Sequence, residues 1–291
     1  MIIYIIFIVI IKQSLNRIRQ SPSLLERDLG RGHTMLILLS PAKIQNFRPQ
    51  QQVREYTLPV YLKEAEQLMQ ELKSYSIREL AELMNVNTKI AEHNADRFFH
   101  WSTPFTPENA KQALWVYNGE VFHGLDAGSM NEQEIAYAQR HLRILSGLYG
   151  VLRPLDLIQP YRLDVTHRLS VGQGGDLYDF WRERISREVQ RALTASGSPH
   201  TILNLMSGEY ARTLDHNLLN ARIIDVEFLQ YQPDTDRFKP IVIYIKKARG
   251  LMARFVIRHE IDSIETLKSF SEEGYWYNEQ LSSDNKLVFV R

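Results

Sequence analysis

Apolar residues along the chain follow two different spacings, which divide it into predicted helices and strands. Leu36–Leu39 is a short continuous apolar run that stops at Ser40-Pro41-Ala42-Lys43, as a buried strand followed by a turn does. Leu58–Leu72 instead places apolar residues at the spacing of one helix face. The same helical spacing, or a helix-capping signal, predicts further helices over Ser76–Met84, Asn87–Phe98, Ser129–Leu142, Asp176–Thr194 and Ala248–His259.

The remaining apolar segments are typical of strands. Asn118-Gly119 separates two short apolar segments and predicts a hairpin between Leu114–Tyr117 and Val121–Leu125. Further strands are predicted over Thr201–Leu205, Ala221–Gln230, Phe238–Lys246, Gly274–Asn278 and Leu287–Val290. No repeat and no linker-like stretch interrupts this order. The pattern therefore predicts the α+β class, with residues 35–291 forming a single compact domain in which helices surround a mixed β-sheet.

The first 34 residues differ from the rest of the chain. Met1–Ile11 is a continuous apolar run, shorter than the roughly 20 residues that a membrane-spanning helix needs. Basic residues follow this run, whereas a secretory signal carries them before it. Met35 opens directly onto the first predicted strand. We therefore expect Met35 to be the biological start and residues 1–34 to be a non-native upstream extension; the alternative is a short apolar segment that anchors the protein to a membrane.

Composition and charge exclude several kinds of chemistry. Hydrophobic residues make up 44% and charged residues 24% of the 291 residues, values that are typical of a globular protein. The chain has no cysteine, which excludes disulfides, thiolate metal sites, iron–sulfur clusters and a peroxidatic thiol. Its nine histidines show no ligand spacing, so the sequence predicts neither a metal site nor a cofactor. The formal charge is +1, so nucleic-acid binding would need a local basic patch.

A segment with two glycines, Leu145–Leu163, is the first candidate for such a patch. Gly147 and Gly150 are three residues apart, and they allow a tight turn whose backbone amides can approach a phosphate. This layout resembles a helix-hairpin-helix, which holds the duplex backbone without reading bases. The basic residues that flank it are Arg143, Arg153 and Arg162. The alternative is that the glycines only mark a tight strand–loop crossing and the arginines pair with nearby aspartates.

A basic cluster late in the chain is the second candidate. Lys246, Lys247, Arg249 and Arg254 recur near one face at helical spacing. Cations close to a helix N-terminus are tolerated best where an anion is shared between them and the backbone amides. An ordinary solvated basic face fits the same pattern. We add Lys43, in the turn after the first strand, to the candidate DNA-binding residues.

A polar loop after the strand Thr201–Leu205 is the third candidate. Small polar groups at the carboxyl edge of a sheet often form sites in α/β proteins. Ser207 lies in Met-Ser-Gly-Glu, which is not a nucleophile motif, and helix capping is its more ordinary role. No catalytic residue is therefore assigned. The alternative hypothesis is an enzyme of unknown substrate, with a pocket formed by Asn204, Ser207, Glu209, Lys246 and Lys247.

Several motifs, taken together and in order, resemble the YaaA peroxide-stress protein family. The resemblance runs from Met35 to Arg291 and leaves residues 1–34 outside it. The segments that carry it are SPAK at Ser40–Lys43, TPENA at Thr106–Ala110, LSGLYGVLRPLDLIQPYRL at Leu145–Leu163, LYDFW at Leu177–Trp181, KKARGLMARF at Lys246–Phe255 and SEEGYWY at Ser271–Tyr277.

The resemblance implies a function that composition and spacing do not supply. It implies a cytoplasmic protein that limits free intracellular iron during hydrogen peroxide stress and so reduces oxidative damage. It also implies a compact fold with a helix-hairpin-helix and a basic cleft that binds duplex DNA without sequence preference. We therefore expect a DNA-binding protein rather than an enzyme, with no membrane partner. Direct iron sequestration is a third hypothesis, but no helical carboxylate–histidine pattern supports it.

Overall fold

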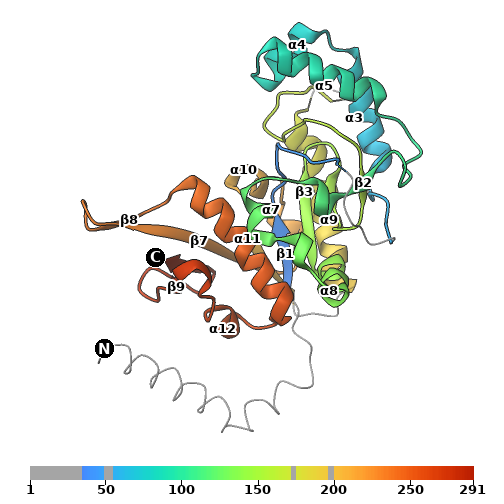
Figure 1. Cartoon of the computed structure of the whole chain (residues 1–291). Helices are drawn as coiled ribbons and strands as arrows, with labels where there is room; N and C mark the ends of the chain where they lie inside the picture. The colour runs from blue at the N-terminus through green and yellow to red at the C-terminus, as the bar shows by residue number, and fades with distance from the viewer. Residues whose placement is uncertain (1–34, 49–54, 172–174, 196–199) are drawn as a thin grey trace, which may run out of the picture. The chain divides into compact units, whose positions relative to one another are not determined.

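The computed structural model describes residues 35–48, 55–171, 175–195 and 200–291, and in them a mostly parallel sheet runs through the middle of the molecule (Figure 1). Its strands follow the order β4-β3-β1-β6-β7-β10-β9, and β8 pairs with β7 outside that path. Their bounds are β1 Met35–Leu39, β3 Leu142–Ser146, β4 Gly150–Leu152, β6 Thr201–Leu205, β7 Arg222–Gln232, β8 Arg237–Lys239, β9 Trp276–Tyr277 and β10 Lys286–Val290.

The first strand lies inside the sheet and not at its edge. β1 pairs in parallel with β3 on one side and with β6 on the other. All five of its residues are buried, because helices cover both faces of the sheet. This explains why MLILL is continuously apolar, as strands of buried parallel sheets are. The prediction of a buried strand at Leu36–Leu39 is confirmed.

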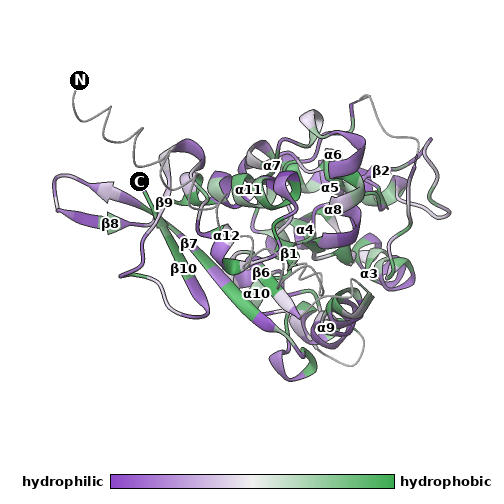
Figure 2. Cartoon of the chain, turned by 90° about the horizontal axis from the view of Figure 1, so that it is seen from below, coloured by the Kyte–Doolittle hydropathy of each residue, from purple (hydrophilic) through white to green (hydrophobic). Residues whose placement is uncertain are grey.

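Helices cover the two faces of the sheet. Figure 2 shows α7, α8 and α11 on one face and α9 and α10 on the other. The bounds of the α-helices are α3 Leu62–Ser74, α4 Ile77–Met84, α5 Thr88–His100, α6 Ala113–Val116, α7 Glu120–Leu125, α8 Glu132–His141, α9 Leu177–Ala195, α10 Gly208–Ala211, α11 Val242–His259 and α12 Ile264–Leu267. A separate pair of short strands, β2 Lys111–Gln112 and β5 Leu157–Ile158, is antiparallel.

Capping residues and apolar periodicity account for most of these helices. Ser76 and Glu79 form a capping box at the start of α4, as the sequence predicts. The second capping box begins two residues later than Ser129, with Asn131 bonded to Glu134 at the start of α8. The fold is thus a mixed α/β domain, which confirms the predicted mixed sheet with surrounding helices.

Three predicted strands are wholly or partly helical in the structure. The hairpin expected around Asn118-Gly119 is wrong, because its two arms are the short helices α6 and α7. The strand expected at Phe238–Lys246 is limited to β8, and α11 begins at Val242. In both places the apolar residues have no clear helical period, so the sequence predicts strands. In the structure, packing between α7 and α11 stabilises the helical conformation of these two segments.

Two glycines allow α7 and α11 to pack backbone against backbone. A Cβ at Gly250 would lie 1.8 Å from the carbonyl oxygen of Val121, and a Cβ at Gly124 would lie 2.2 Å from that of Lys247. No side chain other than hydrogen fits at either position. The close approach brings the N-terminal half of α11 against α7, and both helices contribute to the site described below.

The helix-hairpin-helix predicted at Leu145–Leu163 is wrong, because this segment forms part of the sheet. β3 and β4 pair as an antiparallel hairpin around Gly147. The Ser146 hydroxyl accepts hydrogen bonds from the amides of Leu148 and Tyr149, so these amides are not free for a phosphate. The alternative, in which the glycines serve a tight crossing, describes the structure better.

Each glycine of this hairpin has a packing reason. A Cβ at Gly147 would lie 2.4 Å from the carbonyl oxygen of Leu163. Gly150 has a φ of 70°, a conformation that favours glycine, and it lies against the ring of Trp181. The Trp181 indole in turn donates a 2.8 Å hydrogen bond to the carbonyl of Gly147. The two glycines therefore hold α9 against the end of the sheet.

The sequence predicts that residues 1–34 are an upstream extension and that no membrane is a partner. Residues 1–34 lie outside the described residues, so both readings of Met1–Ile11 stay predictions. Among the helices of the described ranges, none combines the length and the apolar character that crossing a bilayer requires.

Candidate functional site

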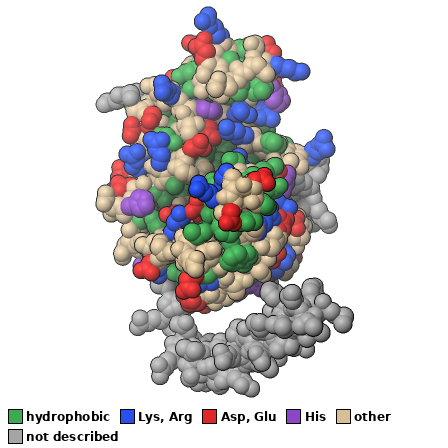
Figure 3. Space-filling view, turned by 90° about the vertical axis from the view of Figure 1, so that its left-hand side faces the viewer, with side chains coloured by type: hydrophobic (Ala, Val, Ile, Leu, Met, Phe, Trp, Pro, Cys, Tyr) green, Lys and Arg blue, Asp and Glu red, His purple; other side chains and the backbone are tan. Residues whose placement is uncertain are grey.

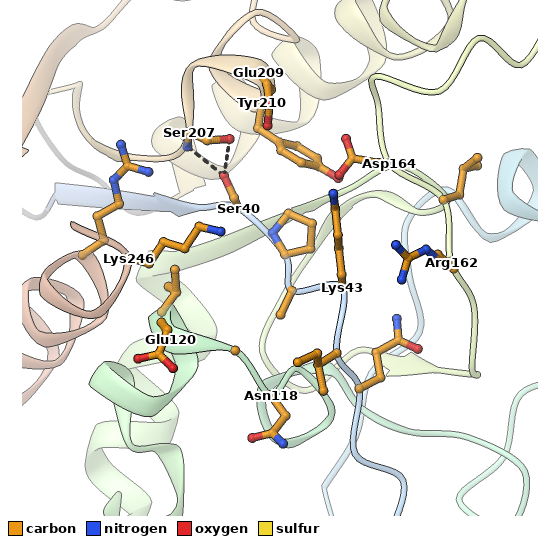
Figure 4. Close-up of a pocket in the computed structure, with 18 of the residues that line it drawn as sticks. Ser40, Lys43, Asn118, Glu120, Arg162, Asp164, Ser207, Glu209, Tyr210 and Lys246 are labelled. Carbon is orange, nitrogen blue, oxygen red and sulfur yellow. Dashed lines mark hydrogen bonds between the residues drawn. The ribbon is translucent and has the colours of Figure 1, made fainter. Parts of the chain in front are cut away.

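A pocket lies at the carboxyl ends of β1 and β6, in the middle of the sheet. Its volume is about 460 Å³, and its walls come from the turn after β1, the loop after β6, the segment after β5, and helices α7 and α11 (Figure 4). β1 and β6 are neighbours, but the chain passes through β3 on the other side of β1 before it returns to form β6. In α/β sheets such a change of direction leaves a crevice where ligands bind.

Two serines connect the strand ends at the base of this pocket. The backbone amide of Ser207 donates a 2.9 Å hydrogen bond to the hydroxyl oxygen of Ser40. The two hydroxyl oxygens are 3.3 Å apart, with Ser40 as the donor. Both serines lie at the cavity, where the remaining lone pairs of Ser207 can meet a ligand. The structure thus gives Ser207 a position in the pocket, and among the described residues no histidine or carboxylate is bonded to it.

Four basic side chains from different parts of the fold line the same pocket. Figure 4 shows Lys43 and Lys246 on opposite sides of the cavity, each directed toward it. The complete set is Lys43, Arg162, Lys246 and Arg249. Within the described ranges, none of these four forms an ion pair with a carboxylate at 4.0 Å or less. The Nε atoms of Arg162 and Arg249 are buried without a hydrogen-bond acceptor.

Acidic groups and a neutral histidine complete the polar lining. Asp164, Glu120 and Glu209 line the pocket, and Figure 4 shows Asp164 near the end of the Lys43 side chain. His167 also lines it, and burial, with Asp164 opposing and Arg162 and Lys43 adding to the effect, lowers the pKa of its imidazole to about 4. His167 is therefore neutral at pH 7, so the charge of the pocket comes from its basic and acidic side chains.

Buried tyrosines form the wall next to Asp164. Burial raises the pKa of Tyr210 well above its ordinary value, and the nearby Asp164 carboxylate adds to that effect. Tyr161 bonds to the hydroxyls of Ser146 and Tyr117 at 2.8 and 2.6 Å, and burial raises its pKa to about 12. These hydroxyls stay protonated at neutral pH, so they can donate hydrogen bonds but do not act as bases.

Two predicted DNA-binding residues near β3 and β4 bond to other parts of the protein, so they are not free side chains in solvent. Arg143 is 7% exposed, and one of its Nη atoms donates to three backbone carbonyls, the shortest bond being 2.8 Å to that of Leu142. Arg153 forms a 2.9 Å ion pair with the fully buried Asp156. The Arg153 pair agrees with the alternative prediction that arginines here pair with nearby aspartates, whereas Arg143 bonds to backbone carbonyls. These contacts also place both side chains outside the pocket lining.

Two more predicted DNA-binding residues, both on α11, have carboxylate partners. Arg254 is only 6% exposed and lies 3.2 Å from Glu134 of α8. Lys247 lies 2.5 Å from Glu273, which it shares with Arg291. The Lys247 pair lowers the pKa of the Glu273 carboxyl. The basic cluster of α11 is thus divided, because Lys246 and Arg249 line the pocket and Lys247 and Arg254 do not.

The predicted alternative pocket is partly assembled. Ser207, Glu209 and Lys246 line the cavity together, whereas Asn204 donates a 2.7 Å hydrogen bond to Asp225 on the neighbouring strand β7. The sequence prediction did not include Ser40, Asp164, His167 or Tyr210. Ser40 could have been found, because it ends a strand predicted to be buried and parallel strands end at one edge. Asp164 directly follows the segment Leu145–Leu163, but its position in the sequence marks it only as a partner for an arginine, and no motif marks His167.

The described residues also bear on metal binding. In the ranges that the structure describes, no three histidine, aspartate or glutamate side chains form a group that could hold a metal ion. The acidic residues of the pocket are accompanied by four cations, which is an unfavourable setting for a divalent metal ion.

Two comparisons with known proteins show which family this chain resembles. A family profile described as peroxide stress protein YaaA matches residues 35–281. A UPF0246 protein of Alteromonas mediterranea is 43% identical over 257 residues, which cover 88% of this chain and 98% of that relative. The profile match includes the strands from β1 to β9 and every residue that lines the pocket. The chain therefore belongs to the peroxide stress protein YaaA family.

Proposed function

We propose that this protein protects the cytoplasm during hydrogen peroxide stress by limiting free intracellular iron, and that it binds duplex DNA without sequence preference. Family membership supports the peroxide-stress role. Less free iron means less hydroxyl radical, so iron limitation and protection of DNA act against the same damage. The proposal assigns no iron site, because the described residues form no metal-binding group.

The observation that carries the DNA-binding part is the convergence of four unpaired basic side chains at one mouth. Lys43 and Lys246 are exposed, and Arg162 and Arg249 are half-buried. Figure 3 shows lysine and arginine side chains grouped on one face of the molecule, interspersed with acidic ones. Such side chains neutralise phosphates and contribute no base readout, which fits binding without sequence preference.

The cellular role predicts a phenotype that depends on iron. A strain that lacks this protein should survive hydrogen peroxide less well than its parent, because more free iron reacts with the peroxide. A cell-permeant iron chelator should restore survival, and so should the gene supplied in trans. Survival is measured as colony counts after a peroxide pulse at matched iron supply. Equal survival of the mutant and the parent would contradict the proposal.

The DNA-binding role predicts a change in salt dependence. Lys43→Ala combined with Lys246→Ala should flatten the slope of log K against log salt by roughly 2 units, because each phosphate contact contributes about −0.9. The loss should be similar for duplexes of different sequence, as measured by fluorescence anisotropy between low and moderate salt. A matched control is Lys63→Ala with Lys89→Ala, two exposed lysines outside the pocket. A folded pocket variant with the parent slope would remove these lysines from the DNA interface.

A further inference from the structure

We propose that the pocket between β1, β6, α7 and α11 binds a nucleoside phosphomonoester, with the phosphate held by Lys43 and Lys246 and the nucleoside against the apolar wall. This site is separate in function from duplex binding. It requires a ligand that enters the cavity, whereas a duplex contacts only charges at its mouth. The inference therefore does not depend on whether the protein binds DNA.

The charge arrangement favours a compact anion with more than one negative charge. Figure 4 shows the Ser40–Ser207 pair near the end of the Lys246 side chain, and the end of Lys43 near Asp164. Two ammonium groups at one cavity repel each other, and an anion bound near both offsets that repulsion. A phosphomonoester carries close to two charges and three acceptor oxygens, enough for both ammonium groups and a serine hydroxyl.

The two arginines of the pocket give a second reason to expect a bound anion. Arg162 and Arg249 each keep a buried Nε–H without an acceptor. A buried donor that is left unsatisfied costs about 1–3 kcal/mol. Burial also lowers the pKa of Arg249, so its charged form gains from any anion that approaches. An anion bound in the pocket would lower the electrostatic cost of keeping these two half-buried cations unpaired.

The rest of the lining fits the nucleoside better than inorganic phosphate. Apolar side chains form much of the wall: Pro41, Ile44, Val121, Leu163 and Leu205. Asp164 has no ion-pair partner within the described ranges, and its Oδ1 accepts hydrogen bonds from the amide and hydroxyl of Thr166. Its Oδ2 is left to accept a hydrogen bond from a ribose hydroxyl. The cavity volume of about 460 Å³ lies within the range of small-ligand sites. Its position at a change of strand order is where α/β sheets bind nucleotides.

Calorimetric titration of the full 291-residue chain at constant ionic strength tests the proposal. The probes are AMP, adenosine and inorganic phosphate. AMP should bind one site per chain, and removal of the phosphate or of the nucleoside should weaken binding at least about tenfold. AMP binding no tighter than adenosine, no tighter than phosphate, or absent altogether would overturn the proposal.

Variants of the pocket lysines test whether AMP binds in this pocket. Lys43→Ala with Lys246→Ala should weaken AMP binding at least about tenfold, while Lys63→Ala with Lys89→Ala should leave it unchanged. Circular dichroism and thermal melting establish that each variant is folded. Binding of AMP at parent strength by the folded pocket variant would overturn the assignment, and a loss shared equally by the control variant would do the same.

A terminal phosphomonoester can belong to a free nucleotide or to the end of a DNA strand. Two short single strands that differ only in a 5′-phosphate or a 5′-hydroxyl distinguish these sources. AMP binding tighter than the phosphorylated strand identifies a free nucleotide, and the reverse order identifies a strand end. A blunt duplex with 5′-hydroxyl ends measures duplex binding alone, so a failure of that role is distinct from a failure of this site.

Discussion

Gly250→Ala is expected to destabilise the protein by about 3 kcal/mol or more, the upper end of the cost of overpacking. The added methyl would lie 1.8 Å from the carbonyl oxygen of Val121 and 2.7 Å from the amide nitrogen of Leu125. Both are backbone atoms of α7, so no side-chain rotation relieves the overlap and the two helices must move apart. Urea unfolding would measure the free energy, and the melting temperature should fall by roughly 10 °C.

Gly128→Ala and Gly208→Ala are the matched controls for this change. Nothing lies within 4 Å of a Cβ at either position, and neither glycine has a positive φ. Both variants should unfold within about 1 kcal/mol of the parent. Because α7 and α11 together wall the pocket, Gly250→Ala should also weaken whatever the pocket binds. Parent-like stability of Gly250→Ala would show that the two helices are not in close contact.

Asp156→Ala is expected to cost about 3–5 kcal/mol, because it removes one partner of a buried ion pair. The Asp156 side chain is fully buried and accepts hydrogen bonds from the Arg153 guanidinium, from the Arg153 amide at 2.7 Å and from Thr57 at 2.6 Å. Asp156→Asn keeps the shape and should cost less. Chemical unfolding of the two variants at pH 7 measures the difference. A smaller loss for Asp156→Ala than for Asp156→Asn would contradict this account.

Arg153→Ala separates the structural role of this arginine from DNA binding. Burial raises the pKa of Asp156, and the Arg153 charge opposes that rise, so removal of Arg153 should raise it further. The native state of the variant then binds a proton that the unfolded state, with a lower pKa, releases. The stability deficit of Arg153→Ala should therefore be smaller near pH 5 than at pH 7. Its salt slope for duplex binding should equal that of the parent.

The sequence predicts the parts of this fold that depend on local signals. Residues close together in the sequence are enough to predict three features. These are the buried strand at Leu36–Leu39, the capping box at Ser76 and the apolar face of the helix Leu177–Ala195. The helices α6 and α7 cannot be predicted in this way, because the apolar residues of these two short segments show no clear helical period. The close approach of α11 at Gly250 stabilises α7, and Gly250 lies more than a hundred residues away from α7 in the chain.

The site was predictable where a strand end marked it. Ser207 and Glu209 follow the predicted strand Thr201–Leu205, and the cavity contains both together with Lys246. From the sequence we assign Arg153 to DNA because it flanks the two-glycine segment, and Arg254 because it belongs to a basic cluster at helical spacing. A basic residue in a sequence does not reveal whether it faces solvent or a buried carboxylate, and here the carboxylates Asp156 and Glu134 lie against them. That distinction depends on tertiary contacts.

The order of strands in the sheet has a consequence for how this protein is synthesised. β1 is complete at residue 39, but its two neighbours end at residues 146 and 205. This apolar strand therefore has no partner until about half of the chain is translated, and it lacks one neighbour until residue 205. β10 lies between β7 and β9, and its residues 287–290 are buried. The sheet can therefore close only after residue 290 has left the ribosome. Long-range pairing of this kind slows folding and exposes strand edges in the meantime, so the nascent chain should be a strong client of ribosome-associated chaperones.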